Sequence, residues 1–386
     1  MVLVVVGLAA LIAMAGLALD TAHVLLNKAR LQSALDAAAL AGAKALDQST
    51  STAWATTAAT RVFDLNVADY PELQRSGVTL TTEFSASFPF SAGTAPATYV
   101  RTSITGFATS MSLIRVLGIT SVSVAGSAVA GPSPSVVQAC NIVPVALCGN
   151  PGVGGPFFGY TLNQVVGLQQ PGGFGGGGGG GAGVGNYRVL SLGGFGGASV
   201  RTNLAGDYAS CTAIGNTATT QAFVNAGDVS DGLNTRFGDY NAGLSSANYP
   251  PDVIHSAAHQ TALTLVGGNV MQRGRVVTMA NQLTFNYANY TALQQAEAFD
   301  TQPSPAGTAA FDRRVLAVPV VDCGGGGVPV RGFACVFLLQ ELGAGNDVIY
   351  GQIINGCESG GKPGAGSTAT GPHVIELFKS AGSEDS

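Results

Sequence analysis

The fold of this chain is decided by MVLVVVGLAALIAMAGLALDTAHVLLNKARLQSALDAAALAGAKA, residues 1–45, which contain no proline. Residues 1–19 carry no charged side chain, and the sequence after Asp20 is rich in helix-favouring Ala, Leu, Gln and Lys. At a rise of about 1.5 Å per residue, the helix would be roughly 70 Å long. We therefore predict one hydrophobic, then amphipathic helix over residues 1–47.

The uncharged part of this helix is long enough to cross a bilayer, which needs roughly 20 apolar residues. A cleaved signal peptide is the alternative, with Ala13-Met14-Ala15 as its cleavage site. No basic residue precedes the apolar run, as a signal peptide would require. We therefore expect residues 1–19 to act as a retained membrane anchor.

The amphipathic half carries a stripe of small and aliphatic residues at three- and four-residue steps. Small residues at this spacing let helix backbones approach closely. This stripe is predicted to be a helix-packing interface between subunits, unless the helix lies on its own globular domain. Its members are Leu31, Ala34, Leu35, Ala38, Gly42 and Ala45. The charged residues are expected on the solvated side or in local pairs, namely Asp20, Lys28, Arg30 and Asp36.

The remaining residues predict an α+β fold in which the helix is followed by β-rich, disulfide-containing domains. Alternating apolar and small polar residues at 78–88, 97–106 and 120–131 predict strands, with a short helix at 107–118 between them. This indicates a small α+β domain over 48–131, whose first residues continue as helix to Leu65. A Pro-Ser-Pro linker then leads into a β-rich domain over 132–386 with a polar tail.

The second domain contains a glycine run at 172–186, which is predicted to be an exposed loop because it buries no side chains. Residues 313–323 and 328–340 flank four glycines and predict an antiparallel hairpin. Further strands are expected at 141–148, 186–192, 347–355 and 373–379, and a short helix at 217–226.

All six cysteines follow the long helix, and none forms a CxxC pair that would favour zinc. An even number of cysteines beyond a membrane anchor favours disulfides in the periplasm or outside the cell. The pairing is left open among Cys140, Cys148, Cys211, Cys323, Cys335 and Cys357.

Motifs for catalysis or ligand binding are weak. His255 and His259 lack the glutamate of a metalloprotease helix, and the GKPGAGST segment at 361–368 lacks the Lys-Ser/Thr of a phosphate loop. The GAGNDVIYG segment at 343–351 is a single copy of a turn that binds calcium only in stacked repeats. We expect no enzyme activity, no cofactor and no metal, with weak calcium candidates at Asp228, Asp231 and Asp347.

The segment LALDTAHVLLNKARLQSALDAAALAGAKAL, residues 17–46, resembles the N-terminal region of the TadE/TadG-like proteins of Tad (Flp) pilus systems. The matching LQ-x-A-x-DAAALAGA pattern covers Leu31 to Ala43. The resemblance extends in patches to 123–132, 232–237, 313–323 and 330–339. It implies a pilin-like or assembly component that is held in the inner membrane and exported by a dedicated secretion machine. Position 5 is valine, where type IV major pilins have glutamate.

Taken together, these features predict a structural, pilin-like subunit of a Tad/Flp-type pilus or surface filament. Its expected partners are copies of itself or other pilin-like subunits, the inner membrane before assembly, and the Tad-type secretion machinery. Its final location would be periplasmic or at the cell surface. With 10% charged residues and a net charge of -5, the chain has no electrostatic footprint for nucleic acid. The alternative is a membrane-anchored adhesin, and a secreted hydrolase is less favoured because no nucleophile and base can be named.

Overall fold

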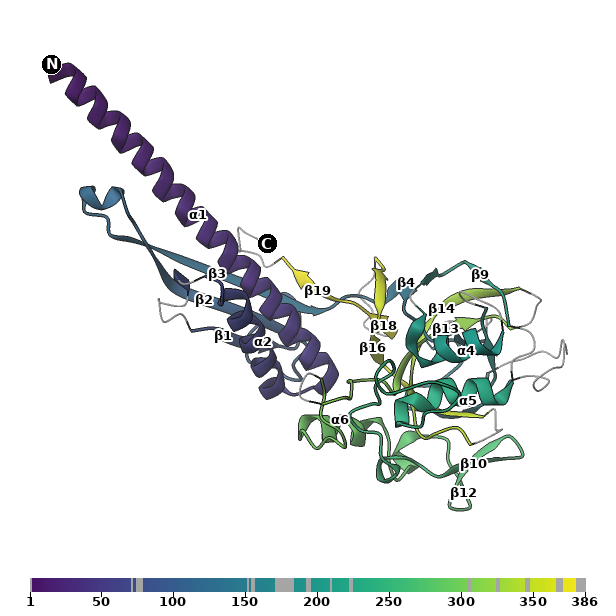
Figure 1. The fold of residues 1–386 in the computed structure, drawn as a ribbon. Helices are drawn as coiled ribbons and strands as arrows, with labels where there is room; N and C mark the ends of the chain where they lie inside the picture. The colour runs from purple at the N-terminus through teal and green to yellow at the C-terminus, as the bar shows by residue number, and fades with distance from the viewer. Residues whose placement is uncertain are drawn as a thin grey trace. The chain divides into compact units, whose positions relative to one another are not determined.

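The computed structural model forms two compact units (Figure 1). Unit 1 comprises residues 1–132 and 375–386, and unit 2 comprises residues 133–374. The structure describes residues 2–70, 72–73, 79–150, 153, 157–170, 184–191, 196–208, 210–221, 225–304, 307–323, 327–343, 348–365 and 371–379, with backbone only at 2–3, 5–13, 116–117 and 207. Most of the predicted glycine loop at 172–186, and Asp347, lie outside the described residues.

Unit 1 begins with the long helix α1, Val2–Ser49, which is unbroken as predicted. The helix ends where Thr50 adopts a left-handed backbone conformation, with a φ of 52°. The hydroxyl of Ser51 then accepts a hydrogen bond of 3.2 Å from the Trp54 N–H and starts helix α2, Thr52–Val67. The predicted helical continuation to Leu65 is therefore a separate helix.

The sheet of unit 1 is antiparallel, with strand order β1-β2-β3-β19. Its strands are β1 Thr81–Ser85, β2 Tyr99–Ser110, β3 Ser121–Pro132 and β19 Ile375–Phe378. The three strands expected in this region are present. In place of the helix expected at 107–118, β2 continues to Ser110, and only the 3-10 helix η1, Ile114–Leu117, follows.

Helix α1 packs against both α2 and this sheet in one hydrophobic core. Strand β3 passes so close to α1 that a Cβ built on Gly126 would lie 2.9 Å from Leu35 Cδ1. The Thr102 hydroxyl donates to the Leu35 carbonyl at 2.9 Å. Residues expected to form separate domains at 1–47 and 48–131 thus share one core, and β19 joins them from the C-terminal end of the chain.

Unit 2 is built on a sheet with strand order β6-β15-β14-β13-β5-β7, in which β9 also pairs with β14. The strands are β5 Val145–Cys148, β6 Val165–Leu168, β7 Tyr187–Val189, β9 Thr217–Ala218, β13 Val315–Val321, β14 Val328–Leu338 and β15 Ile349–Ile354. Strands β13 and β14 form the predicted antiparallel hairpin. The described part of 217–226 does not form the predicted helix, because Thr217–Ala218 pair with β14 and helix α5, Ala226–Asn234, begins only at the end of this segment.

Smaller elements surround this sheet. Unit 2 contains the helices α4 Gly197–Thr202, α5 and α6 Tyr287–Gln295. It also contains the short helices η2 Asn203–Asp207, η3 Thr235–Phe237, η4 Ala257–His259 and η5 Ala280–Gln282. Three further sheets have the strand orders β10-β11-β12, β17-β4-β8 and β16-β18. Their strands are β4 Val136–Cys140, β8 Cys211–Ala213, β10 Leu263–Val266, β11 Asn269–Gln272, β12 Arg275–Val276, β16 Gly356–Glu358, β17 Gly360–Pro363 and β18 Gly371–His373.

The six cysteines form three disulfides, as predicted, and the structure decides their pairing. The pairs are Cys140–Cys211, Cys148–Cys323 and Cys335–Cys357. The first joins neighbouring strands β4 and β8, while the third joins β14 of the large sheet to β16. All three lie within unit 2, and Cys335–Cys357 links the large sheet covalently to the β16-β18 sheet.

Candidate partner-binding face of the N-terminal helix

The predicted helix-packing stripe lies in the core of unit 1. Leu31, Leu35 and Ala38 are fully buried, and Ala34 and Ala45 are exposed by at most 5%. A Cβ on Gly42 would lie 3.2 Å from both Ala59 Cβ of α2 and Val100 Cγ1 of β2. The stripe is therefore a packing interface of α1 with α2 and the sheet of the same chain. We expected the stripe either to pack between subunits or to lie on the chain's own globular domain. The structure shows the second arrangement, because α2 and the sheet of the same chain already cover these side chains.

The preceding part of α1 has the opposite character, since large apolar side chains lie exposed on it. Their exposed fractions are between 48% and 63%, for Met14, Leu17, Leu19, Leu25 and Leu26. At 100° per residue these positions point in more than one direction around the helix. A helix that is apolar on several sides is typical of one surrounded by other apolar groups. We call these five residues the apolar face of α1.

The contact of this helical segment with its own unit is narrow and involves the end of the β2–β3 hairpin. The Asp20 carboxylate accepts hydrogen bonds from the backbone N–H groups of Ser112 (3.2 Å), Leu113 (2.9 Å) and Ile114 (2.6 Å). Next to it, a Cβ on Gly16 would lie 3.0 Å from Leu113 Cβ. Figure 1 shows the first turns of α1 extending beyond the hairpin. The hairpin thus follows α1 only as far as about Gly16.

Asp20 was expected on the solvated side or in a local pair. Both expectations are wrong, because only 4% of the residue is exposed and its hydrogen-bond partners are Ser112, Leu113 and Ile114. The Ile114 N–H, and then those of Ser112 and Leu113, lower the pKa of the Asp20 carboxyl, against the opposing effect of burial. The carboxylate thus stays ionised and caps the first turn of η1. Sequence periodicity could not reveal this role, because the partners lie about 90 residues away.

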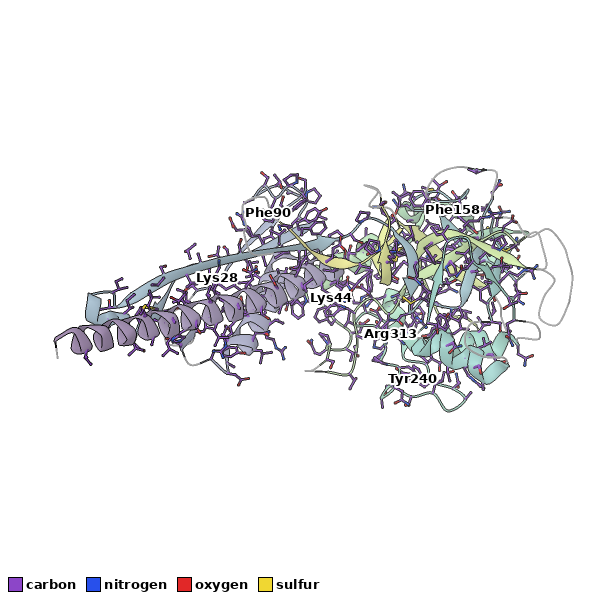
Figure 2. All side chains as sticks on the ribbon, turned by 90° about the horizontal axis from the view of Figure 1, so that it is seen from above. Lys28, Lys44, Phe90, Phe158, Tyr240 and Arg313 are labelled. Atoms are coloured by element: carbon purple, nitrogen blue, oxygen red, sulfur yellow. A yellow bond between two sulfur atoms is a disulfide. The ribbon has the colours of Figure 1, made fainter. Side chains whose placement is uncertain are left out.

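Other charged or titratable groups on α1 also form side-chain contacts. Asp36 accepts a hydrogen bond of 2.8 Å from Gln32, and His23 Nε2 lies 2.7 Å from Glu72 Oε2. Figure 2 labels Lys28 and Lys44 along α1, and Lys44 is exposed. All charged residues of α1 lie at or beyond Asp20, so Met14, Leu17 and Leu19 of the apolar face belong to the uncharged part of the helix.

The hairpin end adds exposed apolar side chains to unit 1. Leu113 is 48% exposed, Ile119 43% and Val122 38%. Leu113 contacts α1 directly beside Gly16, so the apolar surface of the helix continues onto η1. The candidate site thus combines the apolar face of α1 with the hairpin end that Asp20 holds in place.

The predicted metal and ligand candidates do not assemble into a site in the described residues, where no group of three or more His, Cys, Asp or Glu is placed to hold a metal. Arg201 lies 3.7 Å from Asp228 and 3.6 Å from Asp231, so a cation already neutralises both carboxylates. His255 contacts the Phe237 carbonyl, whereas His259 pairs with Asp300 at 2.9 Å. Most of the GKPGAGST segment that is described belongs to the edge strand β17.

Within the described residues, no helix has an apolar window that meets the requirements for a membrane span. Most side chains of the predicted anchor, residues 1–19, lie outside the described residues.

Helix α1 thus carries exposed apolar side chains between Met14 and Leu26 and is buried against α2 and a β-sheet toward its C-terminal end. Residues 1–45 match the family model described as Tad, "Putative Flp pilus-assembly TadE/G-like". The N-terminal segment of this chain is therefore a TadE/G-like domain, which indicates a role in Flp/Tad pilus assembly and an association with its machinery. The three disulfides agree with an extracytoplasmic location. No curated protein and no solved structure matches the chain. The patches of resemblance after residue 45 lie outside the match and stay predictions.

Proposed function

We propose that this protein is a structural, pilin-like subunit of a Tad/Flp-type pilus or surface filament. In this proposal the N-terminal part of α1 lies in the inner membrane before assembly and packs against the same part of neighbouring subunits afterwards. Unit 2 faces outward and makes lateral contacts. The role is architectural and requires no catalysis.

The observation that carries this proposal is the change of character along α1. Between Leu31 and Leu46 most apolar residues of the helix are buried in unit 1, whereas Leu17, Leu19, Leu25 and Leu26 are 48–63% exposed. Exposed apolar residues concentrated on one element are typical of a surface that another molecule or a membrane covers. The TadE/G-like match covers this same helix.

The physical chemistry of assembly supports the same role. Apolar side chains that leave lipid for a bundle of helices remain in apolar surroundings, so the transfer has little hydrophobic cost. Close packing between helices can then favour the assembled state. The stripe at 31–45 is not required for this step, because the fold of unit 1 already uses it.

The test is a triple substitution, Leu17→Gln, Leu25→Gln and Leu26→Gln, in cells that express the full chain. Burying three unpaired amides would cost about 1–3 kcal/mol each. We therefore expect surface appendages, sheared from the cells and counted by electron microscopy, to fall about tenfold or more. The matched control is Leu65→Gln, since Leu65 is 64% exposed on α2.

Normal filaments in the triple variant would contradict the proposal. Filaments lost equally in the Leu65 control would show that the assay reports general damage, and would contradict the assigned face. Wild-type cells that form no filaments yet attach to a surface through this protein would favour the adhesin alternative.

A further inference from the structure

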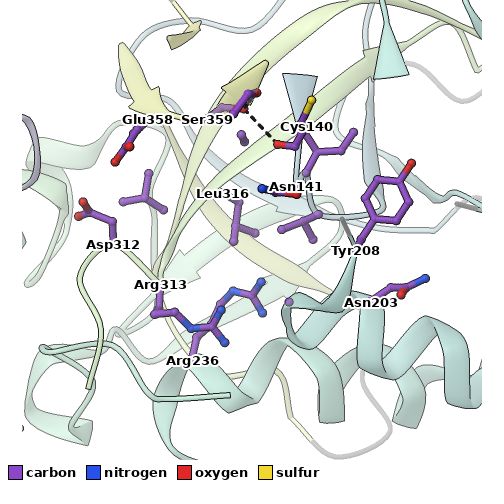
Figure 3. Close-up of a pocket in the computed structure, with 16 residues that line it drawn as sticks. Cys140, Asn141, Asn203, Tyr208, Arg236, Asp312, Arg313, Leu316, Glu358 and Ser359 are labelled. Carbon is purple, nitrogen blue, oxygen red and sulfur yellow. Dashed lines mark hydrogen bonds between the residues drawn. The ribbon is translucent and has the colours of Figure 1, made fainter. Parts of the chain in front are cut away.

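Unit 2 contains a cavity of about 260 Å³ between η2, the start of β13 and the turn that joins β16 to β17 (Figure 3). Two arginines, Arg236 and Arg313, line it together with Asn203 and Tyr208. Neither arginine has a part in the proposed filament contacts. The cavity is large enough to hold a small organic molecule. Two guanidinium groups in one small cavity repel each other, so we asked what stabilises them there.

Arg236 is 3% exposed, yet its hydrogen-bonding capacity is only partly used. Its Nη1 donates to the Leu204 carbonyl at 2.6 Å and reaches the Gly232 carbonyl at 3.4 Å. Among the described residues its Nε has no hydrogen-bond partner. An unsatisfied buried donor on a charged group is costly, so its persistence points to a partner that is absent from the protein itself.

Arg313 makes the environment of Arg236 more positive. Its Nε donates to the Pro250 carbonyl at 3.0 Å and its Nη2 to the Ala205 carbonyl at 2.8 Å. Its Nη1 lies over Gly206, where a Cβ would be 3.2 Å away. Burial, and then the charge of Arg313, lower the pKa of Arg236. The bonds to carbonyl groups hold both arginine side chains in place. The buried carboxylate of Asp252 attracts both guanidinium groups, but this one carboxylate also faces Arg314, so positive charge remains in excess.

No carboxylate of a described residue forms an ion pair with either arginine; the pairs observed in unit 2 involve Arg201, His259 and Arg331. The nearby Asp252 uses its oxygens to accept from Ile254 N–H, Arg314 N–H and the Tyr290 hydroxyl. An anion from outside the chain would supply the missing charge. Guanidinium groups bind carboxylates with particular geometric fit.

The cavity also has acidic groups away from the guanidiniums. Asp312 and Glu358 line it, and Figure 3 shows their carboxylates apart from the guanidinium groups of Arg236 and Arg313. Asp312 Oδ1 accepts a hydrogen bond of 3.2 Å from Gln294. A ligand that reaches from one end to the other would therefore meet donors at one end and acceptors at the other.

We propose that this cavity binds a small zwitterion, with its carboxylate on Arg236 and Arg313 and its amino group toward Asp312 and Glu358. An amino acid is the simplest molecule of this class. The carboxylate could belong to a free molecule or to the end of a short peptide, and the two sources share the same recognition at the arginines.

The test is calorimetric titration of the full chain, kept in detergent micelles, with ω-amino carboxylates of increasing length, from glycine to 6-aminohexanoate. The matched controls are carboxylates of the same length without the amino group. We expect one length to bind about tenfold or more tightly than its control. Triglycine and its C-terminal amide distinguish the sources, since binding of the acid but not the amide would assign the cavity to a peptide end.

The matched variant is Arg236→Lys, which keeps the charge but removes Nε. We expect it to lose about tenfold in affinity with its three disulfides intact by mass spectrometry. If that variant fails to fold, nitrogen-15 NMR of wild-type Arg236 Nε–H provides the readout, and its signal should shift on saturation. Absence of saturable binding by every probe would overturn the proposal, as would equal binding of the amino carboxylates and their controls.

Discussion

Asp20 shows how one residue links the helix to the rest of unit 1. Its carboxylate accepts from three consecutive backbone N–H groups at the start of η1. These donors have no partners within η1 itself, as at any helix start, so a carboxylate there satisfies them and interacts favourably with the local dipole. The Asp20 carboxylate therefore binds the end of the β2–β3 hairpin to α1.

This arrangement predicts that the protection of the Ser112–Ile114 amides from hydrogen exchange depends on pH. The backbone N–H groups lower the pKa of Asp20 below its ordinary value of 3.8 in the folded protein. A lowered pKa means that the stabilisation is present above 3.8 and is lost as the pH falls through the folded value. We expect protection of the Ser112–Ile114 amides, corrected for intrinsic exchange rate, to be high near pH 6 and to fall once the pH is lowered below 3.8.

The substitution Asp20→Ala should remove the same protection at neutral pH. Asp64→Ala is its control, because Asp64 is exposed on α2. Protection of these amides that is independent of pH, or retained in the Asp20 variant, would rule out the capping role.

In unit 2, we expect the loss of the Arg314 side chain to lower the free energy of unfolding strongly. It is fully buried, and its guanidinium donates to the carbonyl groups of Ile254, His259, Leu338 and Leu339 at 2.9–3.2 Å. Its charge also balances Asp252, whose pKa burial raises. We expect Arg314→Met to lower the free energy of unfolding by about 3–5 kcal/mol, because buried acceptors and a buried acid lose their partner. Denaturant unfolding with the disulfides intact measures this.

The control is Arg331→Met, where a half-exposed side chain lies 3.5 Å from Asp322. Exposed pairs of this kind contribute about 1 kcal/mol or less. Equal effects of the two substitutions would contradict the structural role of Arg314.

At the scale of elements, the decisive feature is the packing of α1 on α2 and the sheet. Gly42, Ala38 and Ala34 allow the helix to approach its neighbours, and Gly126 does the same from β3. The physical rule behind the stripe, close approach of backbones at small residues, applies to these contacts as it would to contacts between subunits. The neighbours of the stripe are segments of the same chain.

The substitution Gly42→Leu tests this packing. Its side chain would enter space held by Ala59 and Val100, so we expect unit 1 to lose about 1–3 kcal/mol or more through overpacking. Amide exchange in β2 and β3 under mild denaturant measures the loss. Ala53→Leu, on the exposed side of α2, should change the same quantity by no more than about 0.5 kcal/mol. A stable Gly42→Leu protein that fails only in filament assembly would instead favour an interface between subunits.

At the scale of the whole molecule, the two units are stabilised by different means. Unit 1 contains no cysteine, whereas all six belong to unit 2. Disulfides stabilise mainly by restricting the unfolded chain, typically by about 2–4 kcal/mol each. The Cys148–Cys323 bond spans 175 residues of sequence and connects β5 with the segment that follows β13. The stability of unit 2 is therefore tied to an oxidising environment.

Reduction should accordingly affect the two units unequally. After the three disulfides are reduced and alkylated, we expect amides in β13 and β14 to lose protection from exchange while those in β2 and β3 keep it. Hydrogen exchange with mass spectrometry resolves both sets of peptides. Simultaneous loss of protection in both units, at the same denaturant concentration, would show that they do not unfold separately.

Much of the fold follows from local sequence patterns. The absence of proline and the helix-favouring composition predicted α1 almost to its end, and alternation of apolar residues predicted β2, β3, β13 and β14. The helix expected at 217–226 was wrong because pairing with β14 outweighs the weak local preference of those residues. The expected strand at 373–379 is divided, since β18 pairs with β16 in unit 2 and β19 pairs with β3 in unit 1.

The sequence by itself determined that the chain has a long helix with an uncharged start, β-rich domains after it and cysteines suited to disulfides, because these properties depend on composition and spacing along a few turns or strands. Only the tertiary structure decided which surface covers the small-residue stripe, which cysteines pair, what Asp20 binds and where Arg236 meets Arg313. Each of these depends on contacts between residues distant in sequence, and periodicity within a segment contains no information about its distant partner.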